Sequence, residues 1–160
     1  LDEDTIRKKL KTIELAYKKA PYFNSVYPLV KDIVDNRQEK LSEYLIDSLQ
    51  MIADYLKIDT EFIISSKMRK DNNLKSQDKI IDICKRLGAD EYYNAIGGLE
   101  LYSAKLFAEN EILLFFVQAN DMRYKQFGDN FIANLSILDV MMFNSVEQIS
   151  KMLKEYTLVR

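Results

Sequence analysis

The spacing of apolar residues changes once along this chain, near residue 60, and that change constrains the fold more than any other feature. Before it, apolar residues recur every three or four positions, which is the period of a helix that buries one face. After it, they gather in short runs separated by polar segments, which is typical of buried strands joined by connections. The sequence therefore predicts helices over residues 1–58 and alternating strands and helices over residues 59–118.

Three helices are expected in the first part. Pro21 ends the first of them, and Pro28 is tolerated in the second because it falls within about one turn of the helix start. The polar segment 35–40 connects the second helix to a third, which begins at Leu41. The residues expected to face inward are Ile6, Leu10, Ile13, Tyr17, Ala20, Val26, Leu29, Val30, Ile33, Leu45, Leu49, Ile52, Ala53 and Leu56.

Three apolar runs in the second part predict strands at residues 61–66, 91–96 and 112–117. A helix that ends at Gly88 separates the first two strands, and a shorter helix over residues 101–108 separates the last two. Crossovers of this length make consecutive strands parallel. We therefore expect an α/β fold, with a small parallel sheet of about three strands and crossover helices, preceded by three N-terminal helices and followed by a C-terminal helical segment.

The length of 160 residues suits a single domain. We expect one domain over residues 1–160, in which a loop and C-terminal helices over residues 119–160 follow the helical and sheet parts. Those last helices are predicted at 135–143 and from Val146 to Tyr156. Because the first residue is Leu rather than Met, we expect the chain to be the C-terminal part of a longer protein.

The chain contains no histidine and a single cysteine, and this excludes several kinds of chemistry. The absence of histidine excludes a Ser-His-Asp or Cys-His catalytic group and a histidine-ligated metal site. The single cysteine excludes an intramolecular disulfide and a cysteine-based zinc site. Acid–base chemistry is left to Asp, Glu, Lys or Tyr. We expect no metal and no cofactor, and we expect Cys84, in a helical apolar stripe, to be a buried hydrophobic residue.

Charge and hydropathy narrow the expected partners and location. The net charge is −2 and the isoelectric point is about 5.3, which disfavours nucleic acid because its binders usually carry a basic patch. The longest apolar run, Ile112–Val117, is far shorter than the roughly 18 residues of a membrane span. The acidic first segment is no signal peptide, so we expect a cytoplasmic protein with no membrane span.

Polar residues follow each expected strand, where ligands of open parallel sheets bind. Ser65 lies at the end of the first strand, residues 94–98, with Asn94, Gly97 and Gly98, at the end of the second, and residues 118–120 at the end of the third. Two glycines let a backbone approach a ligand such as a phosphate closely. The alternative is a tight strand-to-helix turn that needs a positive φ, and the sequence leaves both interpretations open.

Two further features indicate either a site or the core. Asp139 stands inside an apolar helix, where a carboxylate is costly unless it has a partner. It is either a buried cap or salt bridge, or a functional group. Tyr92 and Tyr93 point to opposite faces of their strand, so one belongs to the core and the other could stack on a sugar or a base.

Three segments of the chain resemble signature segments of the WbqC-like family. They are KTIELAYKKAPYF at 11–23, AIGGLELY at 95–102 and NLSILDVMMFNS at 134–145. The resemblance implies a bacterial cytoplasmic protein linked to surface polysaccharide or O-antigen biosynthesis. It also implies an N-terminal region that this chain lacks, in agreement with the expectation of a longer protein.

The resemblance implies sugar modification or group transfer, so one hypothesis is an enzyme that transfers an acyl or aminoacyl group to a nucleotide-linked amino sugar. Its substrate would be a nucleotide sugar or an activated acyl group. The alternative is a non-catalytic binding module for a protein partner in the polysaccharide pathway, and the sequence leaves the choice open. In the first hypothesis Gly97 and Gly98 hold a phosphate, Asp139 or Tyr102 is the acid–base residue, and the remaining ligand-binding residues are Asn94, Gln126, Ser136 and Ser65.

Overall fold

The computed structural model describes residues 2–160, which form two compact units. The first unit contains residues 2–62 and 123–154, and the second contains residues 63–122 and 155–160. The chain therefore passes from one unit to the other three times. No helix in the described range is long and apolar enough to cross a membrane.

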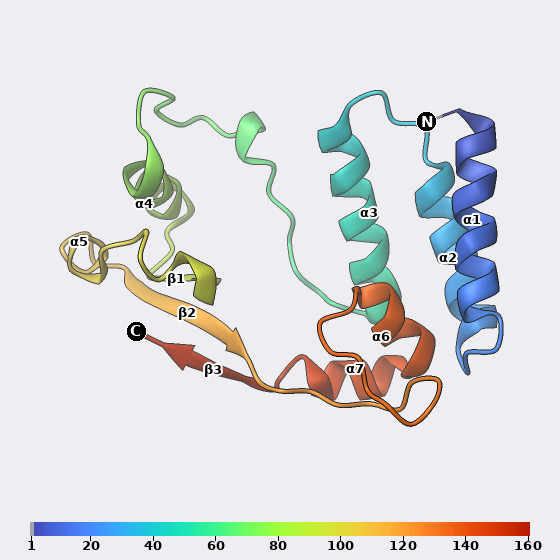
Figure 1. The fold of residues 1–160 in the computed structure, drawn as a ribbon. Coiled ribbons are helices and arrows are strands. Elements are labelled where there is room, and N and C mark those ends of the chain that lie inside the picture. Colours follow the sequence, from blue (N-terminus) through green and yellow to red (C-terminus); the bar gives the residue numbers. More distant parts are fainter. Residues whose placement is uncertain (1) are drawn as a thin grey trace. The chain divides into compact units, whose positions relative to one another are not determined.

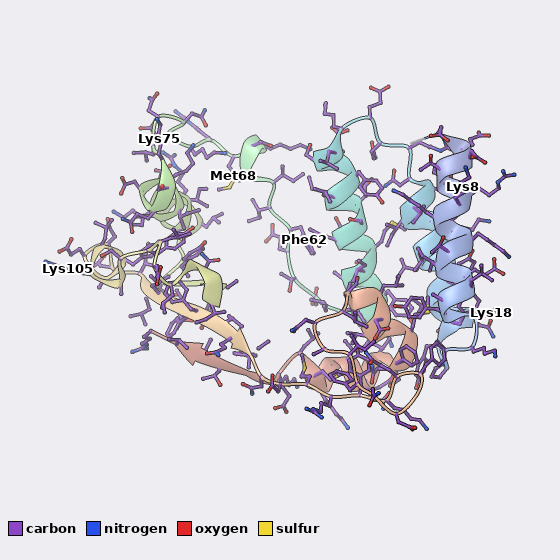
Figure 2. The ribbon with its side chains drawn as sticks, in the orientation of Figure 1. Lys8, Lys18, Phe62, Met68, Lys75 and Lys105 are labelled. Atoms are coloured by element: carbon purple, nitrogen blue, oxygen red, sulfur yellow. The ribbon has the colours of Figure 1, made fainter. Side chains whose placement is uncertain are left out.

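The first unit is helical, and the three predicted N-terminal helices are confirmed. Figure 1 shows the first three helices side by side. Figure 2 shows Lys8 and Lys18 pointing away from the second helix, as expected for the polar face of an amphipathic helix. The helices of this unit are α1 (Glu3–Tyr17), α2 (Phe23–Asp35), α3 (Leu41–Leu56), α6 (Ile137–Phe143) and α7 (Val146–Met152).

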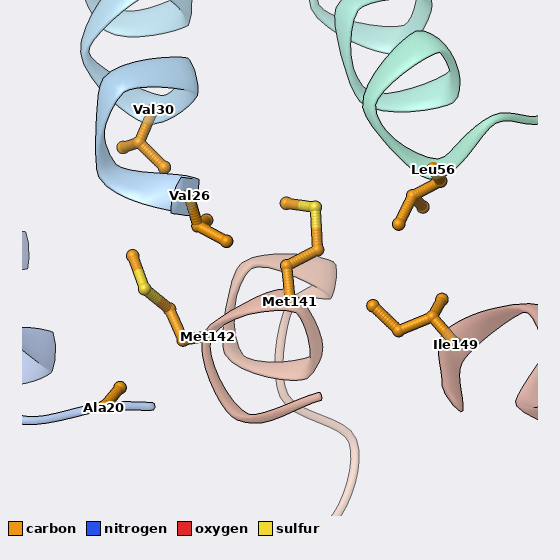
Figure 3. Close-up of a cluster of buried hydrophobic side chains, with 7 residues drawn as sticks. All are labelled: Ala20, Val26, Val30, Leu56, Met141, Met142 and Ile149. Atoms are coloured by element: carbon orange, nitrogen blue, oxygen red, sulfur yellow. The ribbon is translucent and has the colours of Figure 1, made fainter. Parts of the chain in front are cut away.

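Two methionines of α6 lie at the centre of this unit's core. Met142 points toward Val26 of α2, and Leu56 of α3 and Ile149 of α7 point toward each other (Figure 3). Because methionine is unbranched and flexible, it fills the irregular space left between short helices. The buried cluster consists of Ala20, Val26, Val30, Leu56, Met141, Met142 and Ile149.

The second unit contains a three-stranded sheet in the order β1-β2-β3 (Figure 1). Strand β1 pairs with β2 in parallel, with Tyr93 opposite Phe115, whereas β2 pairs with β3 antiparallel. This confirms the α/β class, the number of strands and the parallel pairing of the second and third predicted strands. The elements are η1 (Ser65–Lys67), α4 (Ser76–Leu87), β1 (Glu91–Ala95), η2 (Ile96–Gly98), α5 (Ala104–Ala108), β2 (Leu113–Ala119) and β3 (Tyr156–Val159).

The strand predicted at residues 61–66 is wrong. This run has no strand partner, and Phe62 and Ile63 are 42% and 46% exposed in the segment where the first unit gives way to the second. An apolar run forms a strand only where a sheet edge is free to pair with it, and the edge of β2 opposite β1 is taken by β3.

The third strand comes from the end of the chain, which was predicted to be helical. Helix α7 stops at Met152, and Tyr156 begins β3 instead of continuing the helix. The residues Tyr156-Thr157-Leu158-Val159 are aromatic or β-branched apart from the leucine, and this composition favours a strand. The sheet is consequently mixed rather than wholly parallel.

One face of the sheet carries the core of the second unit. Leu114 and Phe116 of β2 pack with Phe107 of α5 and with Ile81 and Cys84 of α4. Cys84 is buried, as predicted, and burial raises the pKa of its thiol. The opposite face, which contains Tyr93 and Phe115, lies outside this cluster.

Candidate functional site

The predicted turn after β1 is built around Gly98, which is buried. A Cβ atom at this position would lie 2.8 Å from Asn94 Nδ2 and 3.4 Å from the Phe116 ring. Asn94 Oδ1 accepts a hydrogen bond of 2.8 Å from the backbone N–H of Ala95, which fixes the asparagine against the turn. A side chain at position 98 would therefore require Asn94 to shift, and the amide oxygen of Asn94 is already used within the protein.

The alternative interpretation of the two glycines, a turn with positive φ, is wrong. Among the described glycines, positive φ values occur at Gly88 and Gly128. Gly97 is exposed, and a Cβ atom there would meet nothing within 4 Å. Its backbone is thus open to solvent just beyond the end of β1, on the carboxyl-end side of the parallel pair, where β2 continues to Ala119.

Ser65 does not lie at a strand end, because the strand predicted before it does not form. It begins η1, and its carbonyl accepts hydrogen bonds from the Lys70 ammonium and the Met68 N–H. Both contacts use the backbone of Ser65, so its exposed hydroxyl has no role in them.

Tyr102 lies in the aromatic part of the second unit's core. Its ring is 6.0 Å from the rings of Tyr92 and Phe107, and 6.5 Å from that of Phe116. Burial, with a smaller effect from Tyr102, raises the pKa of Tyr92 to about 12. Tyr102 is half-buried in these packing contacts, and its proposed acid–base role remains a prediction.

Asp139 is the centre of a hydrogen-bonded cluster in the first unit, and only 4% of it is exposed. Tyr17 of α1 donates to its Oδ1 at 3.0 Å. Tyr124 and Gln126 donate to its Oδ2 at 2.7 Å and 2.9 Å. Within residues 2–160, no lysine or arginine forms an ion pair with Asp139, so neutral donors alone satisfy this buried carboxylate.

The two tyrosines of this cluster stay protonated at neutral pH. The pKa of Tyr17 is raised to about 12, first by burial and then by its hydrogen bond to Asp139. The pKa of Tyr124 is raised to about 12 by the same two causes in the same order. Both phenols therefore remain donors to the carboxylate, and they are poor proton acceptors in this state.

Gln126 links Asp139 to the loop that precedes α6. Its Nε2 also donates to the Ile132 carbonyl at 3.0 Å, and its Oε1 accepts from the Ile132 N–H at 2.8 Å. Ser136 caps α6, with its Oγ accepting from the Leu138 N–H at 3.2 Å. Both side chains are thus engaged in holding α6 and its loop.

The sequence did not identify Tyr17 and Tyr124 as partners of Asp139. A signal was present for Tyr17, since a tyrosine in an apolar helical stripe buries its ring and needs a partner for its hydroxyl. Nothing near Asp139 in the sequence indicated which tyrosine would supply the donor, because Tyr17 lies 122 positions away.

The predicted site residues divide between the two units. Asn94, Gly97, Gly98, Tyr102 and Ser65 belong to the second unit, and Gln126, Ser136 and Asp139 belong to the first. The structure brings Asn94 against Gly98, and Gln126 against Asp139. A single site that uses both groups remains a prediction.

Two hollows that the sequence did not indicate lie beside α1. One of about 590 Å³ is lined by side chains of α1, the end of α2, the connector 36–40 and the start of α3. A second of about 430 Å³ lies between α1 and the end of α2. Asn36 and Gln38 shape the connector by donating to Asp47 Oδ2 at 2.9 Å and 2.8 Å.

Across residues 2–160, no group of three His, Cys, Asp or Glu residues is arranged to hold a metal ion.

These features define a mixed α/β protein with a polar turn at the end of its parallel strands and a separate buried carboxylate. The chain belongs to the WbqC-like protein family, whose family model matches residues 1–151. No curated protein and no solved structure matches the chain.

Proposed function

We propose that this WbqC-like protein acts in the cytoplasmic assembly of bacterial surface polysaccharide such as O-antigen. In this proposal it transfers an acyl or aminoacyl group to the amino group of a nucleotide-linked sugar. The observation that carries the proposal is the open backbone of Gly97 on the carboxyl-end side of the parallel pair β1 and β2. Ligands of open sheets bind at such edges, and bare backbone suits a phosphate group.

The proposed reaction does not need a histidine. The sugar nitrogen attacks the carbonyl carbon of an acyl thioester, an amide C–N bond forms, and the C–S bond breaks. The sulfur leaves with the bonding electron pair and takes up the proton that the nitrogen loses. The protein then contributes mainly by holding the two substrates in the reactive orientation, which alone lowers the barrier substantially.

Asp139 enters this proposal as a structural residue of the first unit, because its two oxygens already accept three hydrogen bonds. Acid–base catalysis by Asp139 or Tyr102 would instead require one of these side chains to reach the reacting amine. Substitution of each residue, with transfer measured per folded molecule, distinguishes the two roles.

The test uses a uridine diphosphate-linked amino sugar and an acyl thioester with the full chain. We expect the nucleotide sugar to raise the melting temperature, and mass spectrometry to detect the acylated sugar. Gly97→Glu should abolish both effects, because it places a carboxylate where the phosphate would bind. Ala108→Glu, which changes another exposed residue of the second unit, is the matched control and should retain both. Full ligand stabilisation of Gly97→Glu would contradict the proposed site.

A second candidate function is the non-catalytic binding module. It is favoured by the exposed apolar side chains of the sheet in the second unit, namely Tyr93, Leu113, Tyr156 and Leu158. A surface of this kind is typical of protein interaction sites. If Leu113→Glu abolishes association with an enzyme of the polysaccharide pathway in light scattering, and no nucleotide sugar binds, the module is the better description.

A further inference from the structure

Three side chains form a continuous stack across the sheet of the second unit. The Tyr93 and Phe115 rings lie 5.1 Å apart at an interplanar angle of 17°. The Arg160 guanidinium carbon lies 4.7 Å from the centre of the Phe115 ring. Tyr93 and Phe115 are direct partners in the register of β1 and β2, and Arg160 directly follows the last residue of β3. The row therefore runs from β1 across β2 to the residue that follows β3.

The residue in the middle of the row is buried, whereas the residue on β1 is partly exposed. Phe115 is flanked by Tyr93 and by Arg160, and only 7% of it is exposed. Tyr93 is 46% exposed, because β1 is an edge strand and no further strand lies beyond it in the sheet. One ring face of Tyr93 is stacked on Phe115, so the other is available for a further planar group.

Glu91 gives this open position a hydrogen-bond acceptor. The Tyr93 hydroxyl donates to Glu91 Oε2 at 2.7 Å, which holds the ring and the carboxylate on the same face of β1. Glu91 is exposed and forms no ion pair within residues 2–160. A planar ligand stacked on Tyr93 with an N–H in its plane could donate a hydrogen bond to this carboxylate. Hydrogen bonds to an ionised acceptor are stronger than those between neutral groups.

We propose that Tyr93 binds the nucleobase of a nucleotide, which continues the row of Tyr93, Phe115 and Arg160, and that Glu91 accepts a hydrogen bond from a ring N–H of the base. Uracil, thymine and guanine have such an N–H group. The inference rests on the proposed function, in which the nucleotide carries the amino sugar, and adds the residues that bind the base of that nucleotide. A nucleobase is chosen over an aromatic side chain of a protein because the nucleotide-linked sugar of the proposed function carries one.

The binding test uses the full chain and uridine 5′-monophosphate, with affinity measured by isothermal titration calorimetry. Loss of a stacked aromatic side chain weakens base binding by about 5- to 150-fold. We expect Tyr93→Leu to raise Kd within that range, whereas Tyr93→Phe, which keeps the ring, should have a smaller effect. Tyr156→Leu is the matched control, since Tyr156 is equally exposed but pairs with Ala119 outside the row. Unchanged circular dichroism establishes that each variant is folded.

A second ligand tests the role of Glu91. Methylation of the uracil N3 removes the N–H, so N3-methyluridine 5′-monophosphate should bind more weakly than the parent nucleotide. This difference should disappear in Glu91→Leu, which removes the acceptor, whereas glutamine would keep an acceptor oxygen at this position. Equal binding of uridine monophosphate by the wild type and folded Tyr93→Leu, or no binding of uridine or guanosine monophosphate at all, would overturn the inference.

The outcomes separate this inference from the proposed transfer reaction. If Tyr93→Leu weakens nucleotide binding but no acyl transfer is found with any thioester, the nucleobase site stands and the transferase proposal fails. If transfer occurs with a KM for the nucleotide sugar that Tyr93→Leu leaves unchanged, the transferase proposal stands and the nucleobase site is wrong.

Discussion

Replacing Asp139 by asparagine tests the hydrogen-bonded cluster directly, since it changes charge and hydrogen bonding with almost no change of volume. Asparagine keeps one acceptor oxygen and replaces the other with an NH₂ donor. The oxygen is best placed at the Oδ2 position, where it accepts from Tyr124 and Gln126. The NH₂ group then faces Tyr17, whose hydroxyl must rotate and accept.

The magnitude follows from the kind of hydrogen bond that is lost. Bonds to a charged group contribute about 1.5–3 kcal/mol and neutral ones about 0.5–1.5 kcal/mol, so three bonds lose about 3–4.5 kcal/mol together. Part of this loss is offset, because a buried amide is less costly to desolvate than a buried carboxylate. We therefore expect a fall of about 1–3 kcal/mol in the free energy of unfolding at pH 7.

The assay is urea unfolding followed by circular dichroism, with acyl transfer measured per folded molecule. Asp129→Asn, which changes an exposed aspartate in the loop that precedes α6, should leave stability almost unchanged. If Asp139 is a structural residue, Asp139→Asn lowers stability while transfer per folded molecule stays close to that of the wild type, whereas an acid–base role would make transfer per folded molecule fall. An Asp139→Asn variant as stable as the wild type would refute the argument that the donor set outweighs the cost of burying the carboxylate.

Three further predictions concern the packing, titration and cooperativity of the fold. In urea unfolding, Gly98→Ala should lower the free energy of unfolding by about 1–3 kcal/mol, because its Cβ atom would crowd the neighbouring side chains. Gly97→Ala should raise it by about 0.4–1 kcal/mol, because the Cβ atom meets nothing within 4 Å and the unfolded chain loses conformational freedom. Tyr17 and Tyr124 should ionise near pH 12 in an ultraviolet titration, and ionisation of every tyrosine near pH 10 in the folded protein would contradict this. Because folding raises their pKa values above 10.0, the stability that they contribute is complete below pH 10 and is lost as the pH rises toward 12. Residues 1–160 should unfold as one cooperative domain, because the chain passes between the two units three times, and two separate calorimetric transitions would show that the units unfold independently.

The helical part of the fold could be predicted because its pattern is long and local. Helices α1, α2, α3 and α4 each repeat the helical period over at least three turns. Strands β1 and β2 could be predicted because both are apolar or aromatic runs bounded by turn signals. Phe62 and Ile63 show the same local pattern without forming a strand, since pairing depends on a free edge elsewhere in the chain.

The candidate site could be predicted only in part, for a related reason. A carboxylate within an apolar helix indicated that Asp139 has partners, but the partners come from α1 and from an irregular loop. The glycine pair indicated close approach to a backbone, and at Gly98 the approaching group is Asn94 of the preceding strand. In both cases the residue type showed that a constraint exists, and the fold decided what satisfies it.

The hydrogen-bonded cluster around Asp139 has a structural role, because it fixes the orientation of α6 in the first unit. This unit is assembled from two separate stretches of chain, and α6, with seven residues, is less than two turns long. Met141 and Met142 bury α6 against α2 and α3, but contacts of such flexible apolar side chains are not directional. Hydrogen bonds are directional, so donors from Tyr17 on one side and from Tyr124 and Gln126 on the other fix the rotation of α6 about its own axis. The cluster thereby joins the start of the unit to its second stretch of chain in one defined arrangement.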